Sequence, residues 1–99
     1  MRFKQYMNEN KSVQDYSHYT DAQLLREAIL EEYYASNVYS VMATYAKDNR
    51  VKKILKHVSN EEKEHIGEFE HLLEMLDPDH EKNVESGEEE AEEELKGVY

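Results

Sequence analysis

Two helix-length segments, over residues 21–47 and 49–76, each carry an apolar stripe that a carboxylate interrupts. The stripe positions recur every three or four residues, which is the spacing of one face of an α-helix. The first stripe consists of Leu25, Ala28, Glu32, Ala35, Tyr39, Met42 and Ala46, and the second of Val51, Leu55, Val58, Glu62, His65, Phe69, Leu72 and Leu76. A glutamate on a buried face is costly unless it is paired or binds a cation. The pattern therefore predicts two helices that pack together around acidic groups.

Boundary signals define where these helices begin and end. Thr20 followed by Gln23 fits a capping box, so the first helix should start near Asp21. Asp48 lies in the short polar turn between the stripes and can cap the second helix. Pro78 stops that helix near residue 76, because proline disfavours helix at the residue before it. We therefore expect an all-α fold built on an antiparallel two-helix hairpin.

The chain divides into three regions. Residues 1–19 lack periodicity and are predicted to be a mobile N-terminal arm, and residues 20–78 form the helical hairpin. Residues 79–99 are predicted to be an acidic C-terminal linker, over 79–87, followed by a short helix. The run of glutamates over 88–94 repels itself, so this helix should pack weakly.

Composition narrows the class of protein. A two-helix hairpin buries too little apolar surface to be comfortable as a monomer in a chain of 99 residues. The net charge of −11 argues against nucleic acid and against membranes as partners. There is no cysteine, which excludes disulfides and thiolate metal sites. No apolar run approaches the length of a membrane span or signal peptide, so we expect a cytoplasmic protein.

The interrupting polar residues should meet across the hairpin. Glu32 lies 16 residues before Asp48, and Glu62 and His65 lie 14 and 17 residues after it. At ~1.5 Å per residue, the three side chains reach similar levels along the two helices. One Glu and one Glu-x-x-His pair are half of the ligand set of a di-iron or di-manganese carboxylate site in a four-helix bundle. A twofold dimer would supply the other half, so the site should lie between two chains.

Several alternatives stay open at this point. Glu68-x-x-His71 repeats the motif, but it falls beside the apolar stripe and reads as solvated surface. The ligand set does not choose the metal, so manganese, zinc or calcium could replace iron. The chain could be a di-metal peroxidase or a manganese-binding relative. It could also be a non-catalytic dimerisation module whose buried polar residues set helix register.

Two segments resemble the encapsulated ferritins, which are short ferritin-like proteins associated with encapsulin nanocompartments. These are AILEEYYASNVY over residues 28–39 and EEKEH over 61–65. The resemblance implies a hairpin that dimerises into a ferritin-like four-helix bundle, with dimers assembling into a decameric ring. It implies a ferroxidase that oxidises Fe(II) with dioxygen at a di-iron centre and supplies iron for storage. It also implies an encapsulin shell protein as partner and a cytoplasmic location inside the nanocompartment.

The resemblance also implies roles for individual residues. It makes Glu32, Glu62 and His65 the catalytic metal ligands, and it gives Glu31 a role in metal uptake. Tyr39 lies two turns from Glu32 on the same face and is either a core aromatic or a hydroxyl that orients a ligand. Tyr34 stands where the family often has another acid. The final residues, EELKGVY, show no apolar docking peptide, which leaves open whether the chain is cargo, fused to a shell subunit or shell-free.

Overall fold

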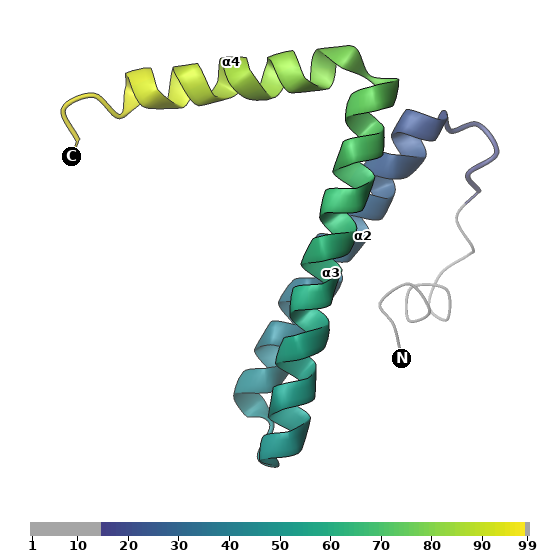
Figure 1. Ribbon diagram of the computed structural model, residues 1–99, viewed down its shortest axis with the longest axis vertical. Coiled ribbons are helices and arrows are strands. Elements are labelled where there is room, and N and C mark those ends of the chain that lie inside the picture. Colours follow the sequence, from purple (N-terminus) through teal and green to yellow (C-terminus); the bar gives the residue numbers. More distant parts are fainter. Residues whose placement is uncertain (1–14, 99) are drawn as a thin grey trace.

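The computed structural model describes residues 15–98, which contain three helices: α2 (Asp21–Tyr45), α3 (Asn49–Leu76) and α4 (Pro78–Glu94). Helices α2 and α3 run side by side in opposite directions, and α4 projects sideways from the end of α3 (Figure 1). The predicted all-α hairpin with a shorter C-terminal helix is therefore confirmed. Most of the arm predicted over residues 1–19 lies outside the described residues.

Both hairpin helices begin at the caps that the sequence signals. The Thr20 hydroxyl accepts from the Gln23 amide at 3.1 Å, and the Gln23 side chain accepts from the Thr20 amide at 2.8 Å. Asp48 caps α3 by accepting from the Arg50 amide at 2.7 Å. The Arg50 side chain also binds this carboxylate and holds the pKa of Asp48 below its usual range. These local hydrogen bonds thus determine where the turn lies and at which residue each helix begins.

Helix α4 starts earlier than the sequence analysis predicted. Residues 79–87, expected to be a polar linker, are helical. Asp77 ends α3 and also begins α4, because its side chain accepts from the Asp79 amide at 3.2 Å. Pro78 then occupies the first helical position, where its missing N–H costs nothing. The same Asp77 carboxylate pairs with Arg26 of α2, and His80 of α4 lies 2.9 Å from Glu70 of α3.

The seam between α2 and α3 changes character along its length. Towards the open end it contains the buried Ile29, Ile66 and Leu73, with Leu25 and Phe69 packed against them. Towards the turn the buried residues are small, namely Ser36, Ala43 and Ser59. The hairpin therefore has a bulky apolar end and a small-residue end, with the interrupting glutamates between them.

The predicted stripes were partly wrong as a description of this seam. Met42, Val51, Leu72 and Leu76 are each about half exposed, although the periodicity placed them in the core. The apolar surface of each helix is wider than one face, so the hairpin buries one side and leaves another uncovered. At the open end the uncovered side forms an apolar groove lined by Leu24, Leu25, Ala28, Leu72, Met75 and Leu76, with Asp21 at its edge. The Cα radius of gyration of 17.3 Å exceeds the roughly 13 Å of a compact 100-residue domain.

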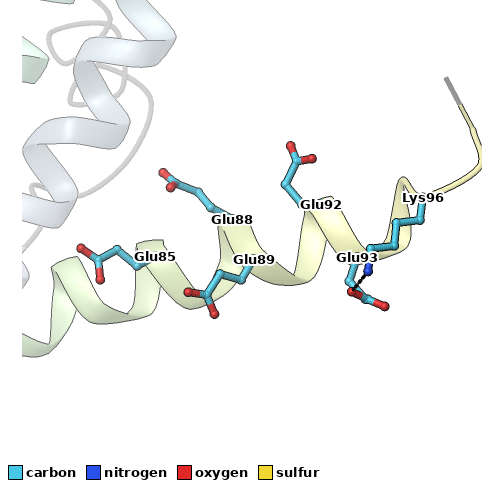
Figure 2. Close-up of a pocket in the computed structure, with 6 residues that line it drawn as sticks. All are labelled: Glu85, Glu88, Glu89, Glu92, Glu93 and Lys96. Carbon is cyan, nitrogen blue, oxygen red and sulfur yellow. Dashed lines mark ion pairs between the residues drawn. The ribbon is translucent and has the colours of Figure 1, made fainter.

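Helix α4 is acidic and almost entirely exposed. Figure 2 shows side chains along it, together with Lys96 just beyond its end: Glu85, Glu88, Glu89, Glu92, Glu93 and Lys96. Lys96 pairs with Glu93 at 2.9 Å, while the other carboxylates spread apart rather than converge. This acidic face is therefore solvated surface. Over the part of the chain that the structure describes, no helix is both long and apolar enough to cross a membrane.

Candidate metal centre

Three side chains from α2 and α3 converge where the bulky and small halves of the seam meet. Glu32 comes from α2, and Glu62 and His65 come from α3. One ligand atom from each lies within 4.8 Å of the other two. Among residues 15–98, no other group of three His, Asp or Glu side chains is arranged to hold a metal ion. The structure thus brings together the three residues that the spacing placed at one level.

His65 faces both carboxylates with the same ring nitrogen. Its Nδ1 lies 3.4 Å from Glu32 Oε2 and 3.4 Å from Glu62 Oε2. The three side chains differ in burial: Glu62 is 2% exposed, Glu32 15% and His65 44%. The cluster is therefore closed towards the seam and open on the side where His65 meets solvent.

The carboxylate of Glu32 has unused bonding capacity. Its Oε2 is buried and makes no hydrogen bond within the described residues, because the contact with His65 Nδ1 at 3.4 Å does not have hydrogen-bond geometry. A buried acceptor left unpaired costs about 1–3 kcal/mol. Two carboxylates and an imidazole are also a ligand set that suits iron, manganese or zinc. Residues 32, 62 and 65 therefore fit a metal ion, which would give this oxygen a partner.

A single chain offers only part of a di-metal site. A bundle site of this type uses two lone glutamates and two Glu-x-x-His pairs, and the hairpin provides one of each. His65 lies seven residues, or two turns, before the half-exposed Leu72, so the two residues share one face of α3. A single hairpin therefore presents half of a di-metal site at its surface.

The remaining residues that the sequence analysis singled out do not belong to this cluster. Glu31 and Tyr39 are half-buried, and Tyr34 is 49% exposed. The roles of Glu31 in metal uptake and of Tyr39 in orienting a ligand stay predictions. Glu68 and His71 are both exposed and belong to no cluster of potential ligands.

Sequence reasoning missed two buried residues next to the ligands. Ser36 follows Glu32 by one turn, and Ser59 precedes Glu62 by nearly one turn. Each is 3% exposed, and their hydroxyls bond across the seam. The signal that could have identified them is a small polar residue at helical spacing from each glutamate, at matching levels on the two helices.

Comparison with known proteins places this architecture in a family. The family described as Rubrerythrin matches residues 23–98. A ferritin-like-encapsulin shell fusion protein from Pyrococcus furiosus is 46% identical over 76 residues, which are 77% of this chain and 22% of the relative. The crystal structure of the encapsulated ferritin domain from Pyrococcus furiosus is similar, with a TM-score of 0.72 and 39% identity. That match covers 83% of this chain and 92% of the solved one.

The extent of these matches determines what they establish. The chain spans about a fifth of the length of the curated relative, so that match concerns a small part of the fusion protein. The solved ferritin domain, in contrast, is matched over nearly its whole length. The family match covers the hairpin from residue 23 onward and all of α4. The resemblance to the encapsulated ferritins is confirmed, and this chain belongs to the rubrerythrin family, a family of di-iron oxidoreductases with a ferritin-like fold.

Proposed function

We propose that this chain is a ferroxidase that oxidises Fe(II) to Fe(III) with dioxygen at a di-iron site shared by two copies. Each Fe(II) ion gives up one electron, and these electrons reduce dioxygen. Two electrons and two protons convert one dioxygen to hydrogen peroxide, and four of each convert it to two molecules of water. The observation that carries this proposal is the convergence of Glu32, Glu62 and His65 around a buried carboxylate oxygen that lacks a donor. The rubrerythrin membership supports the redox chemistry.

The charges of the site suit this reaction. Two copies would bring together four carboxylates and two imidazoles, so their formal charge of −4 would balance two Fe(II) ions. Oxidation raises the positive charge at the site, and fixed carboxylates attract the more highly charged ion more strongly. Glu62 would hold its charge away from water, whereas His65 would stay near the opening through which iron and dioxygen arrive.

The second copy in this proposal would cover the uncovered apolar side of the hairpin. That side includes the half-exposed Met42, Val51, Leu72 and Leu76, and His65 shares the face of α3 that carries Leu72. Burying it in an isologous dimer would hide apolar surface and complete the ligand set in one step. We propose further association of dimers into a ring, as in the encapsulated ferritins that the sequence resembles.

The destination of the iron is also a proposal. One relative is described as a ferritin-like-encapsulin shell fusion protein, and the similar solved domain is described as an encapsulated ferritin. By analogy, we propose that this chain works inside an encapsulin shell in the cytoplasm and delivers Fe(III) for storage there. A hairpin cannot enclose a mineral by itself, which favours a separate compartment.

The decisive test is anaerobic loading with two Fe(II) per dimer followed by exposure to air. We expect rapid dioxygen consumption and an Fe(III) absorption band with the wild type. Glu32→Ala, Glu62→Ala and His65→Ala should each lose most of this activity while keeping their helical circular dichroism. A folded Glu62→Ala variant that oxidises Fe(II) at the wild-type rate would refute the ligand assignment. A wild type that neither binds nor oxidises Fe(II) would instead favour a non-catalytic dimerisation module.

A further inference from the structure

Ser36 and Ser59 form a reciprocal hydrogen-bonded pair across the hairpin seam. The Ser36 hydroxyl donates to the Ser59 carbonyl at 3.0 Å, and the Ser59 hydroxyl donates to the Ser36 carbonyl at 2.8 Å. The two hydroxyl oxygens are 3.2 Å apart. Each serine therefore uses its one proton on the backbone of the other helix, and neither hydroxyl is left unsatisfied in the buried seam.

This geometry constrains the two helices in two directions at once. Serine side chains are short, so each hydroxyl reaches the opposite carbonyl only when the backbones are close and the two residues face each other. Separation of the helices lengthens both bonds, and sliding of α3 along α2 lengthens both as well. The serine pair thus sets both distance and register at this level of the hairpin, whereas the apolar contact of Ile29 with Ile66 tolerates small displacements.

The serine pair also lies directly beside the ligands. Ser36 is four residues from Glu32 and Ser59 is three from Glu62, which correspond to about 6 Å and 4.5 Å along the helix axes. Helices are stiff over one turn, so a displacement at the serines is transmitted to the ligands. Metal–ligand distances are held to within about 0.2 Å, so a slip of even one residue rise would misplace a ligand severely.

A force that acts against the arrangement is present as well. Glu32 and Glu62 place two carboxylates in a cluster whose ligand atoms lie within 4.8 Å, and Glu62 is almost completely buried. Without a cation these like charges repel, and that repulsion pushes α2 and α3 apart. The serine pair is a polar link between the two helices about one turn from the site, and its bonds oppose this separation.

We propose that Ser36 and Ser59 are positioning residues that preorganise the metal site: they hold the two helices at the separation and register at which Glu32 meets Glu62 and His65. The serine pair acts through the backbones of α2 and α3, because each hydroxyl donates to the carbonyl of the opposite helix. This inference depends on the proposed metal site, because it assigns the residues that make the site tight.

The test measures Co(II) binding at 25 °C by the intensity and position of its ligand-field absorption, on variants whose circular dichroism shows that they are folded. The double variant Ser36→Ala/Ser59→Ala removes both bonds and creates no unpaired donor. We expect it to bind Co(II) about tenfold more weakly, the lower end of the loss seen when groups that orient metal ligands are removed. We also expect a shifted absorption band. The single variants should each show a smaller loss and provide a second measurement if the double variant folds poorly.

Leu73→Ala is the matched control, because it removes a fully buried side chain about three turns from Glu62. It should lower the melting temperature more than the double variant does, yet bind Co(II) with nearly wild-type affinity and spectrum. If affinity instead follows melting temperature across the variants, the serines are merely structural. A double variant with wild-type Co(II) affinity and spectrum overturns the positioning role but leaves ferroxidase activity standing. A wild type that binds no Co(II) and oxidises no Fe(II) overturns both proposals.

Discussion

Replacing Glu32 by glutamine should stabilise the metal-free protein and destabilise the metal-loaded one. The substitution keeps the size of the side chain but removes one of two clustered negative charges. Unit charges 4.8 Å apart repel by roughly 3 kcal/mol at an effective dielectric constant of ~20. The buried Oε2 without a donor adds a cost of about 1–3 kcal/mol, although His65 and solvent offset part of both terms.

We therefore expect Glu32→Gln to raise the free energy of unfolding of the metal-free protein by about 1–3 kcal/mol. For a chain of this size, each kcal/mol corresponds to roughly 4–8 °C in melting temperature. The new amide can donate to the facing Glu62 carboxylate, which adds to the gain. With saturating Zn(II) the order should reverse, because the wild type gains more from binding the ion.

The assay is thermal unfolding by circular dichroism at one fixed protein concentration, with chelator and then with Zn(II). Glu68→Gln is the control, since it changes the same charge at an exposed position and should shift both melting temperatures little. Metal-free Glu32→Gln that melts at or below the wild-type temperature would show that the clustered carboxylates carry no energetic penalty. Our account of the site would then be wrong.

Four further outcomes are expected. Metal should drive association, so light scattering should give a larger molar mass with Zn(II) than with chelator at low micromolar concentration; a monomer in both conditions would refute the shared site. Glu68→Ala and His71→Ala should change the rate of Fe(II) oxidation less than about threefold, because both side chains are exposed and lie outside the ligand cluster. Gly67→Ala should stabilise the chain by about 0.5–1 kcal/mol, since an added Cβ in mid-helix meets nothing within 4 Å. A lower free energy of unfolding in urea would instead indicate that another copy of the chain covers α3 at this position. Thr20→Ala should cost about 1 kcal/mol by the same measurement through loss of the capping box, and an unchanged midpoint would contradict that role.

Local signals in the sequence predicted the hairpin well. Thr20 with Gln23, and Asp48 at the turn, act on their immediate neighbours, so their effect can be read without knowledge of the tertiary structure. Once the turn was placed, the levels of Glu32, Glu62 and His65 followed from the constant rise of a helix. Both inferences depend on geometry that packing does not alter.

Which residues are buried between α2 and α3 was harder to predict from the sequence, for a physical reason. Helix α2 carries apolar side chains around much of its circumference, so periodicity alone could not distinguish the side that faces α3 from the side left uncovered. Met42 and Ile29 both satisfy an apolar pattern, yet only Ile29 is buried within the chain. The start of α4 was missed because Asp77-Pro78 is compatible with a helix end and with a helix start. Here both occur at the same residue.

Because α4 is joined to α3 only at Asp77, a small rotation there displaces the far end of α4 by a large distance. Helix α4 has 17 residues and is therefore about 25 Å long, attached through one non-helical residue and steadied by the contact between His80 and Glu70. A rotation of ~10° at this joint would sweep the far end of α4 through about 4 Å, which follows from the helix length. If copies of the chain associate through α4, the angle between neighbouring copies would depend on the backbone torsion angles of Asp77. Those angles would then affect the shape of the assembly more than any single side chain of the acidic helix does.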